Sequence, residues 1–211
     1  WTSGNSNIDA GVTFSESCAV QGNPDYTYVP DNNFEQALID LGYDTALDDF
    51  VLTANISSVT SLNVSSKSIS DLTGIEDLTA LTTLQCNYNQ LTSLDLSGNT
   101  GLTDLRCDNN QLTSLDLSSN PDLLILIMWS NQISSLDLSN NPALQNLYCG
   151  SNQLTSLDVS NTSLNIFNCT SNQLTYLNVK GLEDQLDTFT AVDNSLTCIE
   201  VQNPDWATAN W

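Results

Sequence analysis

The sequence of 211 residues contains no histidine and only three lysine and arginine residues. The missing histidine removes the commonest general base and metal ligand, which argues against an enzyme. With 25 acidic residues the net charge is −22, so the chain lacks the clustered cations that nucleic acid or an anionic membrane surface requires. No run of about 18 apolar residues is present, and the sequence therefore predicts no membrane span.

The N-terminus lacks the features of a complete precursor. The chain begins at Trp1 rather than at a methionine, and no charged segment followed by an apolar segment precedes it. We therefore interpret the chain as a fragment of a larger protein. Its acidic balance fits an extracellular or high-salt setting.

Internal repetition is the dominant pattern of the sequence. From Leu81 the frame L-x-x-L-x-C-x-x-N-x-L-T-S-L-D-L-S-x-N recurs in steps of 20 to 22 residues. The first leucines of the copies are Leu81, Leu102, Leu123, Leu144, Leu164 and Leu186. A divergent copy starts at Val59, which gives about seven coils when the degenerate last copy is included.

A single copy cannot bury its own leucines, so the copies must stack on one another. Each copy contains two similar halves, such as "LTTLQCNYN" and "LTSLDLSGN". We therefore expect two parallel strands in each coil, and a mainly β solenoid with parallel sheets and little helix. The recurring asparagine of the first half is expected to hold backbone groups at a bend.

The motif L-x-x-L-x-[LC]-x-x-N-x-L, which runs from Val59 to Val201, resembles the leucine-rich-repeat signature. Its style is similar to that of leucine-rich-repeat proteins secreted by Bacteroidetes, especially flavobacteria. The stretch "ISDLTGIEDLTALTTL" in the first repeats resembles internalins. The resemblance implies a leucine-rich-repeat solenoid on a secreted or bacterial cell-surface protein, with a role in adhesion or glycan capture.

The two ends are expected to differ from the array at 59–201. Residues 29–58 contain "PDNNFEQALIDLG", which predicts a short capping helix that starts after Asp31 or Asn32 and stops at Gly42. Phe34, Leu38 and Leu41 would share its buried face. The resemblance implies that residues 1–28 cap a preceding repeat array and that 202–211 begin a C-terminal cap. A simple linker, or a strand packed on the N-terminal cap, is the alternative for 1–28.

The six cysteines fall into two groups. Cys86, Cys107, Cys149 and Cys169 share one inward column with Met128 and Ala191, which predicts buried thiols that serve as small apolar side chains. Cys18 and Cys198 lie outside this column and are disulfide candidates. The resemblance implies that each forms a disulfide across a cap, Cys198 with a later cysteine and Cys18 with an earlier one. A bond within one chain and a head-to-tail bond between two chains are the alternatives.

Acidic residues provide weak candidates for Ca²⁺, and no other cofactor is expected. One group is the loop with Asp44, Asp48 and Asp49. The other is the outward column of the second half-repeats, which contains Asp95, Asp116, Asp137 and Asp158. We favour solvated carboxylates at both places, because the loop matches no EF-hand spacing and a flat column offers each ion too few ligands.

Outward positions of the first half-repeats vary from coil to coil, which makes this surface the natural place for recognition. The segment "LLILIMWSNQ" puts isoleucine and tryptophan where neighbouring coils have polar residues. An apolar patch with a polar rim, here Arg106, Asp104 and Asp108, is typical of a binding site. The predicted binding residues are Tyr88, Arg106, Ile125, Ile127, Trp129, Tyr148, Ile166 and Asn168.

The sequence therefore predicts a non-catalytic extracellular recognition module whose partner is a protein or a polysaccharide. Neighbouring domains of the same parent chain are further expected partners. The alternative is a structural spacer in a tandem cell-surface stalk. A glycan-active enzyme with two carboxylates is a remote alternative, because coils of 20 to 22 residues leave no loops to build a pocket.

Overall fold

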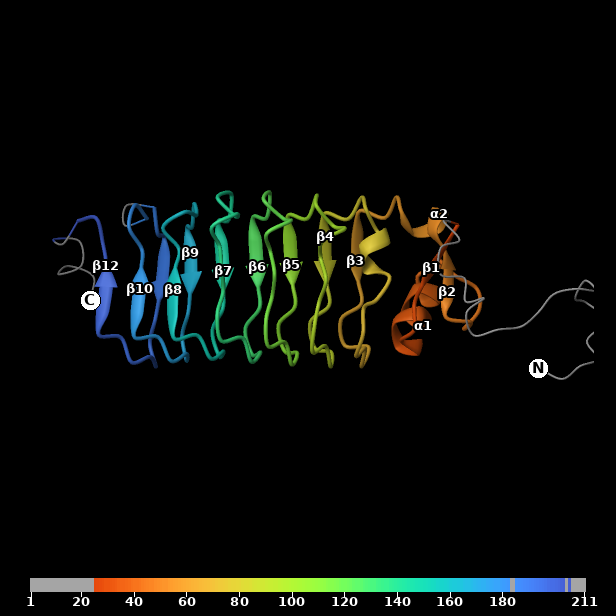
Figure 1. Ribbon diagram of the computed structural model, residues 1–211, viewed down its shortest axis with the longest axis horizontal. Helices are drawn as coiled ribbons and strands as arrows, with labels where there is room; N and C mark the ends of the chain where they lie inside the picture. The colour runs from red at the N-terminus through yellow and green to blue at the C-terminus, as the bar shows by residue number, and fades with distance from the viewer. Residues whose placement is uncertain (1–24, 183–184, 204, 206–211) are drawn as a thin grey trace, which may run out of the picture.

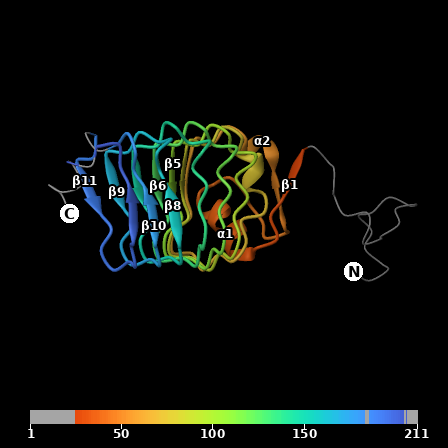
Figure 2. The same cartoon turned by 60° about the vertical axis from the view of Figure 1, so that its left-hand side comes forward.

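The computed structural model describes residues 25–182, 185–203 and 205. The coils stand side by side in a row that runs from β3 to β12, with α1, α2, β1 and β2 at the N-terminal end in both views (Figure 1, Figure 2). The fold is a mainly β leucine-rich-repeat solenoid of about seven coils, as the repeat frame predicts. None of the described helices is long and apolar enough to cross a membrane.

The N-terminal end combines a two-stranded antiparallel sheet with two short helices. β1 (Tyr26–Tyr28) pairs antiparallel with β2 (Phe50–Leu52), and the short α2 (Thr53–Ile56) follows directly. α1 (Asn32–Asp40) begins after Asp31, whose carboxylate accepts hydrogen bonds from the backbone N–H groups of Asn33 and Phe34 at 2.9 and 3.0 Å. These bonds satisfy two of the N–H groups that a helix start leaves unpaired.

The buried face of α1 contains fewer residues than the sequence predicts. Phe34 and Leu38 are fully buried, but Leu41 is 46% exposed. Leu41 is the C-cap residue, and Gly42 after it has a φ of +82°, so the chain turns away before Leu41 reaches the core. The prediction was right for Phe34, Leu38 and the stop at Gly42, and wrong for Leu41.

The first half of each coil forms a continuous parallel sheet in the order β11-β9-β7-β6-β5-β4-β3. Its strands are β3 (Ser61–Asn63), β4 (Thr83–Gln85), β5 (Asp104–Arg106), β6 (Ile125–Ile127), β7 (Asn146–Tyr148), β9 (Ile166–Asn168) and β11 (Thr188–Thr190). Equivalent repeat positions pair directly, for example Leu105 with Leu126. Each column of side chains therefore runs straight along the solenoid with a step of about 4.8 Å.

The second half of each coil forms strands only near the C-terminal end. β8 (Ser156–Asp158), β10 (Tyr176–Asn178) and β12 (Cys198–Glu200) pair in parallel. In the earlier coils the corresponding segments are not strands, so the expectation of two strands in every coil was wrong for them. A 3₁₀ turn, η2 (Ile75–Asp77), lies on this side of the first coil.

The missing second strands coincide with a second column of asparagines. Asn99, Asn120 and Asn141 follow the unpaired segments and are fully buried. Each side-chain amide donates to two backbone carbonyls of the preceding coil, as Asn120 does to those of Leu96 and Asn99. Thr162 replaces the asparagine after β8, where direct strand pairing begins. Hydrogen bonds from the side-chain amides thus join successive coils where strand pairing does not.

The first asparagine column follows the strands of the large sheet. Asn110 donates from Nδ2 to the carbonyls of Cys86 and Cys107 and accepts at Oδ1 from the backbone N–H of Leu91, all at 3.0 to 3.1 Å. One amide therefore serves backbone groups of two coils, and Asn89, Asn131, Asn152, Asn172 and Asn194 repeat the pattern. The predicted structural role of this column is confirmed.

The core consists of columns of identical or similar side chains. Leu84, Leu105, Leu126, Leu147 and Phe167 are fully buried in one of them. Cys86, Cys107, Cys149 and Cys169 are buried free thiols beside it, and burial raises the pKa of each of these thiols, to about 12 for Cys86 and Cys169. Met128 is also fully buried in their column. The prediction of buried thiols that serve as small apolar side chains is confirmed.

The repeat frame predicts which of two adjacent side chains can be truncated to alanine with little loss of stability. Met128 is fully buried, whereas the adjacent Trp129 is 46% exposed. We expect Met128→Ala to lower the free energy of unfolding by about 2–5 kcal/mol, and Trp129→Ala to lower it by less than about 1 kcal/mol. Chemical denaturation of the two variants measures both values. A larger loss for Trp129→Ala would show that the side chain belongs to the core.

Gly98 is required by the 3₁₀ turn of the first coil. A Cβ at this position would lie 2.2 Å from the carbonyl oxygen of Glu76 in η2. We expect Gly98→Ala to destabilise the fold by about 1–3 kcal/mol, because the backbone must move to relieve the contact. Ser119→Ala, at the equivalent place one coil later, is the matched control and should change stability by less than about 0.5 kcal/mol. Equal melting temperatures for the two variants would contradict the assignment.

Glu35 on α1 should make stability depend on pH. Its side chain is 1% exposed and accepts the backbone N–H of Asp48 at 2.8 Å, and burial raises the pKa of this carboxyl. Its stabilising contribution is therefore complete below the unfolded pKa of about 4.5 and is lost as pH rises through the higher folded pKa.

The corresponding test is thermal unfolding of Glu35→Gln and wild type at pH 4.5 and pH 7. We expect the variant to lose less stability than the wild type as the pH rises between the two values, because it lacks the carboxyl whose pKa burial raises. Asp122→Asn removes one negative charge from an exposed position and controls for the general repulsion of an acidic chain. The same pH dependence in both variants would contradict the role of Glu35.

Candidate functional site

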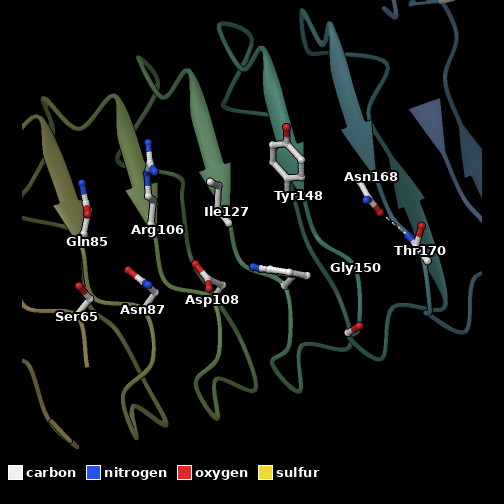
Figure 3. A pocket seen from close by; sticks show the side chains of 12 residues that line it. Ser65, Gln85, Asn87, Arg106, Asp108, Ile127, Tyr148, Gly150, Asn168 and Thr170 are labelled. Carbon is white, nitrogen blue, oxygen red and sulfur yellow. Dashed lines mark hydrogen bonds between the residues drawn. The ribbon is translucent and has the colours of Figure 1, made fainter. Parts of the chain in front are cut away.

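A pocket of about 620 Å³ lies on the outward face of the seven-stranded sheet. It is built from two neighbouring columns, the last residue of each strand and the residue two positions further along (Figure 3). Its lining comprises Ser65, Gln85, Asn87, Arg106, Asp108, Ile127, Trp129, Tyr148, Gly150, Ser151, Asn168 and Thr170. We call this surface the variable face.

Alternation along each strand explains why these side chains point outward. In β5, β6 and β7 the middle residue is a buried leucine, and the residues on either side are half-buried. Successive side chains of a strand point to opposite sides of a sheet. A core that needs a leucine at every middle position therefore leaves the flanking positions free to differ between coils.

Arg106 is held within its own strand. Its Nε and Nη2 donate to the two carboxylate oxygens of Asp104 at 3.2 and 3.1 Å, which is a bidentate ion pair. The bonds to Asp104 raise the pKa of the Arg106 guanidinium above its usual range, and Asp108 adds to the effect. The positive charge of Arg106 is thus largely balanced inside the protein.

Asp108 contributes the carboxylate of the pocket. The residue is 6% exposed, and its Oδ2 accepts a hydrogen bond from Nδ2 of Asn109 at 2.8 Å. Figure 3 shows it beside Asn87, in the row next to Arg106 and Ile127. Among the described residues Asp108 is the one carboxylate that lines this pocket.

Apolar surface occupies the centre of the pocket. Ile127 and Tyr148 are half-buried on adjacent strands, and Trp129 is 46% exposed. Gly150 follows Trp129 in the same column, and a Cβ there would lie 2.9 Å from the carbonyl oxygen of Thr170. A side chain at this position is therefore disfavoured, which leaves the space next to Trp129 open.

The pocket includes five of the eight predicted binding residues. Arg106, Ile127, Trp129, Tyr148 and Asn168 line it. Tyr88, Ile125 and Ile166 do not line it, although Tyr88 is 56% exposed. The prediction selected the apolar outward residues, whereas the pocket is lined mainly by the last residue of each strand and the residue two positions further along. It therefore left out Gly150 and counted Asp108 only as part of the polar rim.

The aspartate column on the second half-repeats has a local structural role. Asp95, Asp116, Asp137 and Asp158 each accept the backbone N–H of the serine two residues later at 2.9 Å. Bonds from this serine lower the pKa of Asp95, Asp116 and Asp137. For Asp158, burial opposes such bonds, and the net pKa is also lowered. This geometry is the solvated hydrogen-bonded arrangement that the sequence favours.

One cluster of carboxylates lies close enough for a metal ion. A carboxylate oxygen of each of Glu35, Asp44 and Asp48 lies within 4.8 Å of the others. The sequence named Asp44 and Asp48 as Ca²⁺ candidates together with Asp49, and the structure brings Glu35 rather than Asp49 into the group. Occupancy by Ca²⁺ stays a prediction.

Of the two cysteines outside the core column, only Cys198 belongs to the described part of the chain. Cys198 is an exposed free thiol in β12. Cys18 lies outside the described residues, as do most of the N-terminal extension 1–28 and of the segment 202–211. The predicted disulfides therefore stay predictions.

Comparisons with known proteins give relatives from Listeria monocytogenes, and no protein-family model matches the chain. Internalin J is 41% identical over 73 residues, which is 35% of this chain and 8% of that protein. Its solved functional domain, described as including a cysteine ladder, is 31% identical with a TM-score of 0.66 and covers 82% of this chain.

A second solved structure, internalin C2 of Listeria monocytogenes, has a TM-score of 0.63 at 21% identity, and the match covers 83% of this chain and 95% of that one. That similarity supports the fold alone. The chain spans about half the length (48%) of the solved internalin J domain. The repeat motif and the fold show a leucine-rich-repeat solenoid, and the comparisons show that it is similar to internalins.

Proposed function

We propose that the chain is a non-catalytic recognition module that binds a protein partner through its variable face. The observation that carries the proposal is the pocket around Ile127, Trp129 and Tyr148, on the side of the solenoid where the coils differ. An exposed aromatic side chain in a partly apolar pocket with a polar rim is typical of an interface anchor. The similarity to internalins supports a protein-interaction module.

The ionisable groups of the pocket favour binding over catalysis. Hydrolysis of a glycosidic bond normally uses two carboxyl groups that flank the bond. Asp108 is the single carboxylate among the described lining residues, and Arg106 is engaged by Asp104. The pocket thus offers a shape and hydrogen-bonding groups but lacks a paired acid and base.

The proposal places the module on a secreted or cell-surface bacterial protein. Its acidic composition and its similarity to internalins support this location. The similarity to secreted Bacteroidetes proteins stays a prediction, since the relatives described above come from Listeria. Polysaccharide binding is the rival for the same face, because aromatic side chains such as Trp129 and Tyr148 also stack on sugars.

The proposal can be tested by selecting ligands for the wild-type protein from a random dodecapeptide display library, with a glycan array in parallel. We expect enriched peptides whose affinity falls by at least about 30-fold with Trp129→Ala, which equals the roughly 2 kcal/mol typical of an interface anchor. Tyr26→Ala is the matched control, because Tyr26 in β1 is also 46% exposed but lies outside the pocket. Its variant should bind with unchanged affinity.

Two outcomes would contradict the proposal. Selected peptides that bind Trp129→Ala and wild type equally would show that recognition uses another surface. Glycan binding that depends on Trp129, without any enriched peptide, would replace the protein partner with a carbohydrate.

A further inference from the structure

All three cationic side chains of the protein are engaged in ion pairs. Lys67 contacts Asp40 at 3.1 Å, Arg106 contacts Asp104 at 3.1 Å, and Lys180 contacts Glu200 at 2.8 Å. The whole sequence contains three lysine and arginine residues in total. Each of the three cations is therefore already paired with a carboxylate other than that of Asp108, although the charge of Asp108 also acts on Arg106.

Asp108 belongs to none of these three ion pairs, and it lies inside the pocket. Its Oδ2 is engaged by Asn109, but no described residue donates a hydrogen bond to Oδ1. The residue is only 6% exposed, so water screens this carboxylate less than it screens the aspartates on the opposite side of the solenoid. A partly buried carboxylate with an open acceptor favours a donor that carries positive charge.

Trp129 lies next to Asp108 along the solenoid. The two residues occupy equivalent positions in adjacent coils, and the backbone N–H of Asn109 donates to the carbonyl of Trp129 at 3.0 Å. Both side chains line the pocket, together with Ile127 and Tyr148. The pocket therefore joins an acidic group, an exposed indole and apolar surface, with the open space at Gly150 on the far side of Trp129.

We propose that the pocket binds an arginine side chain from a basic segment of the protein partner. The guanidinium pairs with the Asp108 carboxylate and stacks on the Trp129 indole, while its methylene stem packs on Ile127 and Tyr148. Arginine suits this combination better than lysine, because its planar fork matches a carboxylate and stacks on aromatic rings. This inference rests on the proposed function of the variable face.

The charge of the whole protein supports the same partner. A net charge of −22 attracts a basic segment over distances longer than one contact and accelerates its association at low ionic strength. An acidic segment would meet repulsion from the protein and find no free cation on it.

The experiment follows the indole N–H resonance of Trp129 in ¹⁵N-labelled protein at low ionic strength. The sequence contains four tryptophans, so comparison with Trp129→Ala assigns the signal. The probes are N-acetyl-arginine amide and N-acetyl-citrulline amide, which have nearly the same shape but differ in charge. We expect arginine to shift the signal saturably, with an affinity about 5- to 10-fold higher than that of citrulline.

Asp108→Asn and Asp116→Asn separate the local effect from the overall charge. Both variants remove one negative charge, but Asp116 lies on the opposite side and is exposed. We expect Asp108→Asn to weaken arginine binding about 5- to 10-fold and Asp116→Asn to leave it nearly unchanged. Because the arginine–citrulline comparison uses the wild-type protein, it holds even if Asp108→Asn disturbs folding.

Equal affinity for arginine and citrulline, or arginine binding that is unaffected by Asp108→Asn, would overturn the proposal. A shift of the Trp129 signal by a neutral oligosaccharide but not by arginine would also overturn it. Uncharged peptides that depend on Trp129 in the display selection would confirm the proposed function of the face while rejecting its cationic ligand. The failures of the two proposals are thus distinguishable.

Discussion

The side-chain amide of an asparagine, shared between the backbones of two coils, is the interaction on which the solenoid depends. A turn at every corner leaves backbone groups that no strand can pair, and leaving such groups unpaired in the interior costs about 1–3 kcal/mol each. Asn110 meets this requirement for Cys86, Cys107 and Leu91 at once. Since every amide reaches into the preceding coil, stacking is specified by hydrogen bonds as well as by burial of leucine.

The two asparagine columns also explain why the two sides of the solenoid differ. After the first strands, the amides supplement a continuous sheet. After the second segments, the amides of Asn99, Asn120 and Asn141 stand where no sheet is present. Once the column ends at Thr162, β8 and β10 pair directly. Side-chain amides and strand ladders are therefore alternative ways to join the same two backbones.

Sequence reasoning succeeded for the inward positions of the repeated columns, although it wrongly expected a second strand in the earlier coils. The leucine, cysteine and asparagine columns each occur often enough for period and spacing to predict their inward positions, as at Met128. It failed where the burial of one side chain depends on a local turn or on the flanking coils. Leu41 fits the apolar pattern of α1, but the turn at Gly42 removes it from the core. Asp108 looked like part of a polar rim, and its low exposure appears only when the flanking coils are in place.

The repeated core allows the outward residues of the variable face to differ from coil to coil. A strand of three residues places its middle leucine in the core, so the half-buried residues on either side of Leu126 can differ from coil to coil. Coil-to-coil differences such as Asp108, Trp129 and Gly150 can then accumulate at neighbouring places about 4.8 Å apart. That spacing is small enough for a single bound side chain to contact two coils at once. The identity of a ligand is consequently set by adjacent coils together, and a carboxylate beside an indole selects for positive charge with an apolar stem.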